Sequence, residues 1–251
     1  MKFVGIIPAR YASTRFPGKP LVEVGGKMMI QRVYEQVSKL LSDVYVATDD
    51  QRIETAVQSF GGKVIMTSAL HQSGTDRIAE AVAKIAEKGS QFDAAINIQG
   101  DEPFISPQQI QLLMDCFTDS STQIATLVKV IETDETLFNP NSPKVVINNK
   151  NEAQYFSRST IPFIRGKEQK DWLSAHTFYK HIGIYAFKVE VLNAVTRLPQ
   201  SSLELAESLE QLRWIENGYK IKVAVTNEEG IAIDTPADLE RANEWFIKNK
   251  R

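Results

Sequence analysis

Three cationic side chains gather near the start of the chain, in the stretch IIPARYASTRFPGKPL that covers residues 6–21. They are Arg10, Arg15 and Lys19, and the first acidic residue of the chain, Glu23, comes only after them. Arginine suits bidentate contact with a phosphate group, and lysine supplies a mobile point charge. The residue types therefore indicate a phosphate-binding loop, with a solvated loop of clustered cations as the alternative.

This loop differs from the two most familiar phosphate cradles. The sequence contains no G-x-x-x-x-G-K-[ST], and no G-x-G-x-x-G follows a predicted strand. The loop would depend on side-chain charge, with the hydroxyl groups of Ser13 and Thr14 as further donors. A strand is predicted before it and a helix after it, so backbone N–H groups and a helix N-terminus would favour the same anion.

Two acidic residues follow apolar stretches that are predicted to be strands. Asp101 comes after AAINIQ, and Asp234 comes after IAI. Ligands of open α/β sheets bind beyond the carboxyl ends of strands, and Mg²⁺ prefers oxygen ligands such as carboxylates. Glu102, Asp49 and Asp50 also follow predicted strands and compete for such a role. Asp234 directly precedes a predicted helix, so capping of that helix is the alternative for this residue.

Composition excludes several classes of protein. The chain has 251 residues, is 43% hydrophobic and carries a net charge of −2, so no overall field attracts nucleic acid or an acidic membrane. The only cysteine, Cys116, excludes an internal disulfide and a cysteine-based zinc site, and suits a reducing compartment. No apolar run resembles a secretion signal or a membrane span. We expect a cytoplasmic protein that binds neither nucleic acid nor membranes.

The first half of the chain alternates between two patterns. Apolar runs typical of buried strands lie at Phe3–Ile7, DVYVATD, KVIMT and AAINIQ, and between them apolar residues recur at helical spacing. This alternation predicts an α/β fold with a parallel sheet covered by helices on both faces. The elements would place the cationic loop and Asp101 at the same edge of that sheet.

The pattern changes near Thr122. Four stretches, QIATLVKVI, KVVINN, AQYFSR and HIGIYAF, are strand-like with little helix between them, and NNKNE resembles a hairpin turn. We expect a mixed or antiparallel addition to the parallel core. The stretch NPNSP, residues 139–143, is the best candidate for a subdomain boundary.

The last fifty residues predict helices and strands again. Leu205, Leu209, Leu212 and Ile215 fall on one helical stripe, with Glu210 on its polar side. KIKVAVT is predicted to be a strand and IAID a short one. In TPADL, Thr235 is suited to the N-cap of a final helix.

The opening loop resembles the signature loop of the sugar-activating nucleotidyltransferases. Within that superfamily the chain is most similar to the 3-deoxy-manno-octulosonate cytidylyltransferases. The resemblance continues along nearly the whole chain, at VATDD, SGTDR, NIQGDEP, YFSRSTIP, HIGIYAF, LEQLRWIENG and IDTPADLERA. It implies a Rossmann-like nucleotide-diphospho-sugar transferase fold in a single domain, residues 1–251. A strand-rich sub-region at about 139–190 would serve sugar binding and dimer contact.

The resemblance implies transfer of CMP from CTP to 3-deoxy-D-manno-octulosonate (Kdo), with release of pyrophosphate, which activates Kdo for lipopolysaccharide synthesis. Such a transfer needs positioning and charge neutralisation more than a protein nucleophile. In agreement, the three histidines are scattered, and no Cys/His or Ser/His/Asp arrangement is visible.

The resemblance also assigns roles to individual residues. It selects Asp101 and Asp234 as ligands of Mg²⁺, and these two acids with Arg10 and Lys19 as catalytic residues. The residues implied to bind the nucleotide are Arg10, Ser13, Arg15, Lys19, Ser73, Thr75, Arg77 and Gln99. For Thr75, capping of a helix is an equal alternative.

The sugar acid would be held by a second set of residues. The resemblance implies Gln99, Arg158, His181, Tyr185, Glu210 and Gln211, with Arg158 and His181 as candidate donors to the Kdo carboxylate. Membership of a strand surface is the alternative for His181 and Tyr185, and simple solvation is the alternative for Glu210. The family further implies a homodimer.

Three other functions stay open at this point. The enzyme could activate a related sugar acid such as 8-amino-Kdo, or the chain could be a nucleotide-binding regulator without catalysis. An NAD-dependent oxidoreductase is a third alternative, and the missing glycine fingerprint disfavours it.

Overall fold

The computed structural model describes residues 1–13 and 15–249. The chain divides into two compact units. Unit 1 comprises residues 1–111, 188–196 and 230–251, and unit 2 comprises residues 112–187 and 197–229. The expectation of a single domain with a sub-region at about 139–190 stays a prediction.

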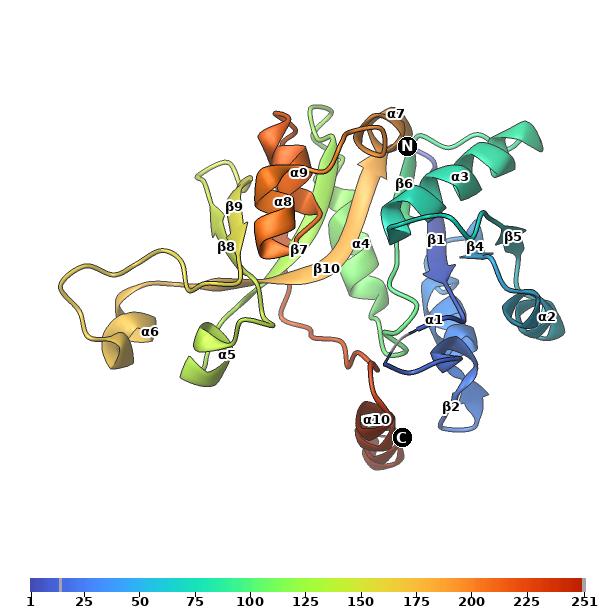
Figure 1. Ribbon diagram of the computed structural model, residues 1–251, viewed down its shortest axis with the longest axis horizontal. Helices are drawn as coiled ribbons and strands as arrows, with labels where there is room; N and C mark the ends of the chain where they lie inside the picture. The colour runs from blue at the N-terminus through green and yellow to red at the C-terminus, as the bar shows by residue number, and fades with distance from the viewer. Residues whose placement is uncertain (14, 250–251) are drawn as a thin grey trace. The chain divides into compact units, whose positions relative to one another are not determined.

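Unit 1 contains a parallel sheet of four strands in the order β6-β1-β4-β5. The strands are β1 (Phe3–Ala9), β4 (Val44–Thr48), β5 (Val64–Met66) and β6 (Ala94–Asn97). The helices that follow or flank them are α1 (Met29–Val37), α2 (Gln51–Ser59), α3 (Gly74–Glu87) and α7 (Val189–Val195) (Figure 1). Helix α4 (Pro107–Cys116) runs from this unit into the other.

The central strand β1 is buried on both faces, as its continuous apolar sequence predicts. On one face, Gly5 leaves room for α1, because a Cβ atom at this position would lie 3.1 Å from side chains of Val37 and Leu41. On the other face, Pro8 lies near Gly74 at the start of α3. Helices therefore cover both faces of β1, and the residues at its carboxyl end are available to line a site.

The connection between the cationic loop and α1 differs from the expected direct entry into a helix. A 3₁₀ turn, η1 (Lys19–Leu21), comes first, and a hairpin of β2 (Glu23–Val24) and β3 (Lys27–Met28) follows it. The final helix α10 (Pro236–Asn249) packs in the same part of unit 1, where Val24, Met29, Ile233 and Ala242 form a buried cluster. Gly25 and Gly26, with φ of 57° and 82°, form the turn of this hairpin in a conformation that favours glycine and interrupts a helix.

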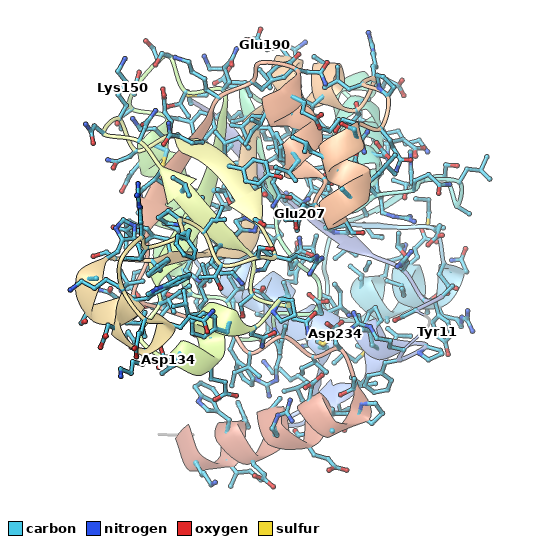
Figure 2. All side chains as sticks on the ribbon, turned by 60° about the vertical axis from the view of Figure 1, so that its left-hand side comes forward. Tyr11, Asp134, Lys150, Glu190, Glu207 and Asp234 are labelled. Carbon is cyan, nitrogen blue, oxygen red and sulfur yellow. The ribbon has the colours of Figure 1, made fainter. Side chains whose placement is uncertain are left out.

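Unit 2 is a mixed sheet, as the change of pattern near Thr122 predicts. Strand β7 (Ile124–Val130) pairs antiparallel with β10 (Tyr179–Lys188) and parallel with β11 (Ile221–Val225). Strands β8 (Lys144–Ile147) and β9 (Ala153–Ser157) form the expected hairpin, with Lys150 in its turn (Figure 2). The helical elements are α5 (Asp134–Phe138), η2 (Gln169–Asp171), α6 (Trp172–Ala175), α8 (Ser202–Glu207) and α9 (Gln211–Glu216).

Two expectations about the last fifty residues are wrong. The stripe from Leu205 to Ile215 belongs to two short helices, because Ser208 takes a left-handed conformation with φ 50° and breaks the chain between them. Leu205 is 61% exposed, so it does not share the buried face of Leu212. The stretch IAID is not a strand; Ile233 donates one backbone hydrogen bond to Asp101 O, and its side chain packs in the buried cluster of unit 1.

The architecture confirms the expected fold class, an α/β protein with a mainly parallel sheet flanked by helices and a strand-rich mixed part. Among the residues that the structure describes, no helix is both long and apolar enough to cross a membrane.

Candidate active site

A cavity of about 350 Å³ lies in unit 1, at the carboxyl edge of the parallel sheet. Its walls come from the loop after β1, the loop after β6, the N-terminal end of α3 and the segment before α10. The charged lining residues are Arg10, Arg15, Lys19, Arg77, Asp101 and Asp234. Four cations against two carboxylates give the cavity a positive balance that favours an anion.

Lys19 lies between the two carboxylates that the sequence singled out. Its Nζ atom is 2.7 Å from Asp101 Oδ2 and 2.9 Å from Asp234 Oδ1. Burial disfavours the ammonium form, but Asp101 and Asp234 outweigh burial and raise the pKa of Lys19. The side chain therefore remains a cation, and the two acids converge on one point that holds positive charge.

Asp234 does not cap the final helix, although only Thr235 separates it from α10 (Figure 2). Its Oδ2 atom lies 3.1 Å from Arg15 Nη2, while Oδ1 binds Lys19. Capping is done by Thr235, whose Oγ1 accepts from the Asp238 amide, and by Asp238, whose carboxylate accepts from the amide of Thr235. Both oxygens of Asp234 therefore face cations of the cavity.

The N-terminal end of α3 forms another wall, with Ser73 and Gly74 in the cavity lining. Ser73 is the N-cap: its hydroxyl accepts from the amide of Asp76, and the Asp76 carboxylate accepts from the amide of Ser73. The alternative that Thr75 caps this helix is therefore wrong. Thr75 lies inside the first turn, is 2% exposed and does not line the cavity, so its nucleotide-binding role stays a prediction.

Arg77 reaches the cavity from α3 although it is only 5% exposed. Its Nη1 donates to Thr67 Oγ1 at 2.7 Å, and its Nη2 lies 3.3 Å from Asp49 Oδ2. Asp49 is therefore engaged with an arginine rather than with the pair at Lys19. Its neighbour Asp50 accepts from the amide of Arg52 as the N-cap of α2, which is a structural role.

The loop after β6 brings Gln99, Gly100 and Asp101 against the end of β1. Gly100 is required at this approach, because a Cβ atom there would lie 2.8 Å from the backbone oxygen of Pro8. Gln99 and Asp101 thereby reach the same cavity as Arg10 and Ser13. Thr14 lies outside the described residues.

The residue types around Lys19 are suited to bind a hard divalent cation. Two carboxylates supply oxygen ligands, and they already converge on a cationic group. Within residues 1–13 and 15–249, no group of three or more His, Cys, Asp or Glu side chains could hold a metal ion. An ion here would thus need further oxygen ligands from a bound phosphate or from water, and Mg²⁺ accepts such mixed shells.

The candidate sugar-binding residues, Gln99 apart, lie in unit 2. His181 and Tyr185 are neighbours on β10, with ring centroids 5.2 Å apart. His181 Nε2 lies 3.0 Å from Thr126 Oγ1, and burial lowers the pKa of the imidazole to about 3. At neutral pH His181 is therefore uncharged, so it can offer a neutral hydrogen bond but no positive charge to a carboxylate.

Tyr185 and Gln211 carry buried polar atoms without a hydrogen-bond partner among the described residues. These atoms are Tyr185 Oη and Gln211 Nε2, on side chains that are 7% and 5% exposed. Burial, followed by the nearby Glu210 carboxylate, raises the pKa of Tyr185 well above its usual value. Leaving a buried donor unpaired costs about 1–3 kcal/mol, and a polar ligand that accepted from these two groups would recover that cost.

Glu210 is not simply solvated, since its side chain is 27% exposed and lies 4.0 Å from Arg213 Nη2. Arg213 in turn binds Glu204 through Nε at 2.8 Å and through Nη2 at 2.5 Å. This buried pair joins α8 to α9 and thereby fixes the segment that carries Glu210 and Gln211.

Arg158 lies at the end of β9 and is held by backbone oxygens. Its Nε donates to Glu207 O at 2.7 Å, Nη1 to Pro140 O at 3.1 Å, and Nη2 to Ser208 O at 3.3 Å. A guanidinium has five N–H groups, so two are left for a ligand. A structural role is visible for Arg158, and its contact with a carboxylate stays a prediction.

Sequence reasoning missed several residues that line the cavity in unit 1. His71 and Gln72 precede the SGTDR stretch, and Pro8, Ala9 and Pro20 flank the cationic loop. Their residue types carry no signal for phosphate chemistry. The proximity of His71 and Gln72 to Ser73 was the available clue.

Known proteins resemble this chain in sequence and in fold. The sequence profile of the family described as Cytidylyltransferase matches residues 4–221. The 3-deoxy-manno-octulosonate cytidylyltransferase of Parabacteroides distasonis is 65% identical over 246 residues, covering 96% of this chain and 97% of that relative. The protein of the same name from Bacteroides thetaiotaomicron is 64% identical and covers 100% of both chains. A solved structure of CMP:2-keto-3-deoxy-manno-octonic acid synthetase complexed with CTP is 42% identical, with a TM-score of 0.91 over 99% of both chains.

Proposed function

Because the chain belongs to the cytidylyltransferase family, and within it to the 3-deoxy-manno-octulosonate cytidylyltransferases, we propose that it transfers CMP from CTP to Kdo. The anomeric oxygen of Kdo forms a bond to the α-phosphorus of CTP. The bond from that phosphorus to the bridging oxygen of pyrophosphate breaks, and the hydroxyl proton is released. The products are CMP-Kdo and pyrophosphate.

The observation that carries this proposal is the cavity of unit 1, where four cations surround two converging carboxylates. Arg10, Arg15 and Lys19 hold the triphosphate and offset the charge that develops as pyrophosphate leaves. Ser13, the α3 N-terminus at Ser73 and the Arg77 guanidinium add donors along the nucleotide. Gln99 serves the ribose or sugar hydroxyl groups.

Asp101 and Asp234 would hold Mg²⁺ together with phosphate oxygens. When bound, this ion would neutralise phosphate charge and favour loss of the sugar hydroxyl proton. Lys19, whose Nζ atom lies 2.7 Å from Asp101 and 2.9 Å from Asp234, would stay beside both acids and contact the phosphate groups.

Recognition of Kdo is assigned to unit 2. The unpaired atoms Tyr185 Oη and Gln211 Nε2 donate to sugar hydroxyl groups, and Glu210 accepts from one. His181 contributes a neutral hydrogen bond, because burial keeps the imidazole uncharged. Arg158 is the remaining cation for the Kdo carboxylate, through the N–H groups that backbone oxygens leave open.

The test is a pyrophosphate-release assay with CTP, Kdo and magnesium. We expect turnover with CTP and Kdo to exceed turnover with other nucleotides, with glucose 1-phosphate or with 8-amino-Kdo. Faster turnover of 8-amino-Kdo would assign the enzyme to that substrate instead. CTP binding without pyrophosphate release for any sugar acid would indicate a regulator.

Two further properties belong to this proposal. The enzyme is cytoplasmic, in keeping with its single cysteine, and it forms a homodimer, as expected from the family. Sedimentation of the purified protein would test the dimer, because a monomer of 28.2 kDa at micromolar concentration would contradict it.

A further inference from the structure

The segment between β5 and α3, residues 67–73, forms one wall of the nucleotide cavity through His71, Gln72 and Ser73. It has little apolar anchoring, since Leu70 at its centre is 83% exposed. Its place must therefore be set by polar contacts. Those contacts come mainly from one face of α3.

Three residues of α3, spaced by three and four positions, hold this wall and the end of β5 just before it. Arg77 donates to Thr67 Oγ1, and Lys84 donates to Met66 O at 2.8 Å. Between them, the Glu80 carboxylate accepts from the amide of Ser68 at 2.8 Å and contacts His71 Nε2. Residues at i, i+3 and i+7 share one helix face, so this stripe faces the wall along its length.

Glu80 is the residue of this stripe that reaches His71. Its other oxygen, Oε1, lies 2.8 Å from Lys84 Nζ, so one carboxylate joins the helix to both ends of the segment from Ser68 to His71. Burial alone would raise the pKa of Glu80, but Lys84, the Ser68 amide and His71 outweigh burial and lower it to about 2. The group is thus ionised wherever the enzyme works.

We propose that Glu80 is a positioning residue for the nucleotide: it does not touch CTP, but it holds His71 in the cavity wall. This inference rests on the proposed use of the cavity for CTP. Because Glu80 occupies Nε2 of the imidazole, the ring has a fixed orientation, and Nδ1 is the nitrogen that remains for a ligand. Ordering the wall before CTP arrives lowers the conformational cost of binding.

The test compares Glu80→Gln with Glu87→Gln. Both replacements remove one negative charge from α3, but Glu87 is exposed at the last residue of the helix, one turn beyond Lys84, and does not line the nucleotide cavity. We expect Glu80→Gln to weaken CTP binding in calorimetry by about tenfold, as loss of one charge-assisted contact would do. We expect kcat at saturating CTP and KM for Kdo to stay within about twofold, and Glu87→Gln to match the wild type.

A double-mutant cycle with His71→Ala identifies the route of the effect. If Glu80 acts through His71, the double variant binds CTP no more weakly than His71→Ala alone. Additive losses, or a lowered Tm with unchanged CTP affinity, would overturn the proposal. Should Glu80→Gln fold poorly, Glu80→Asp keeps the charge on a shorter side chain and is expected to show a smaller loss of CTP affinity. The proposal would also be overturned if Glu80→Asp bound CTP as tightly as the wild type while His71→Ala bound CTP more weakly.

The two levels of the proposal fail separately. If the wild type turns over CTP and Kdo but the Glu80 variant binds CTP with normal affinity, the proposed function stands and the positioning role of Glu80 is contradicted. If the wild type binds CTP without consuming Kdo but the Glu80 variant binds CTP more weakly, the proposed function is contradicted and the positioning role stands.

Discussion

At the scale of single residues, the position of Lys19 explains how two like charges coexist in one cavity. Asp101 and Asp234 come from segments far apart in sequence, and their carboxylates would repel each other without a cation between them. Lys19 supplies that cation at 2.7 and 2.9 Å. In the free protein, Lys19 and the two carboxylates therefore already form a charged site. A nucleotide that carries its own cation can bind there.

We predict that Asp234→Asn nearly abolishes turnover, by about 100-fold or more, while the fold survives. The physical reason is that the replacement removes a charge beside Lys19 and Arg15 but leaves the helix cap at Thr235 intact. Pyrophosphate release as a function of magnesium concentration, with Tm on the same sample, measures both effects. The matched control is Asp238→Ala, which removes the capping carboxylate and is expected to cost about 0.5–2 kcal/mol with activity largely kept. An active Asp234→Asn enzyme would remove this residue from the site.

Tyr185 provides a test in which stability and binding change in opposite directions. Its buried Oη atom interacts weakly with Thr126 and makes no hydrogen bond of normal geometry in the described part of the chain, so Tyr185→Phe removes a poorly satisfied group. We expect the free energy of unfolding to stay the same or rise, and Kdo affinity to fall by about tenfold to hundredfold. Denaturant unfolding and Kdo titration measure the two quantities. Tyr179→Phe, on the same strand, is the control; equal Kdo affinity in the two variants would contradict the prediction.

At the scale of elements, α8 and α9 are too short to be stable by themselves, with six residues each. They are held together by the bidentate pair of Arg213 and Glu204, whose side chains are 10% and 9% exposed. Glu204 also accepts from the amide of Ser201 at the start of α8. One buried carboxylate therefore stabilises both helices and, through them, the segment of Glu210 and Gln211.

We predict that Glu204→Gln destabilises the protein by about 3–5 kcal/mol, because it removes the bidentate counter-charge of the buried Arg213 guanidinium and leaves the Glu210 carboxylate 4.0 Å away. Denaturant unfolding at neutral pH measures this loss. The control is Glu168→Gln, which breaks an ion pair with Lys170 whose side chains are 75% and 73% exposed. The control should change the free energy of unfolding by less than about 1 kcal/mol. A similar small change in Glu204→Gln would show that packing alone holds the two helices.

At the scale of the whole molecule, resistance to acid depends on His181. Its pKa is 6.5 in the unfolded chain and about 3 in the fold, because burial disfavours the imidazolium. The unfolded chain therefore binds more protons below pH 6.5, and stability falls as the pH falls from there toward 3. Glu80 adds a second loss below pH 4.5, since contacts from its neighbours lower its pKa to about 2.

We predict that the free energy of unfolding drops by about 1–2 kcal/mol more in the wild type than in His181→Gln when the pH is lowered from 7 to 5. His71 and His176 are present in both proteins, so the difference between the two slopes isolates His181. Urea unfolding at a series of pH values is the measurement. Parallel slopes would show that the imidazole is protonated as easily in the fold as in the unfolded chain.

Local sequence patterns are sufficient to predict the alternation of strands and helices and the chemical types at the cavity. The buried strands β1 and β6 follow from continuous apolar runs, and the cations Arg10, Arg15 and Lys19 are recognisable because no acid interrupts them. These features depend on local patterns, which a sequence records directly.

Which of these groups come into contact cannot be predicted from local patterns and follows from the folded chain. That Lys19 lies between Asp101 and Asp234 depends on contacts between residues 82 and 215 positions apart. That Glu80 holds His71 depends on how the segment before α3 folds back onto that helix. The break at Ser208 and the absence of a strand over IAID have the same origin, because tertiary packing overrides weak local preferences. Residue type predicts which chemistry is available, and the fold sets the distances at which that chemistry can act.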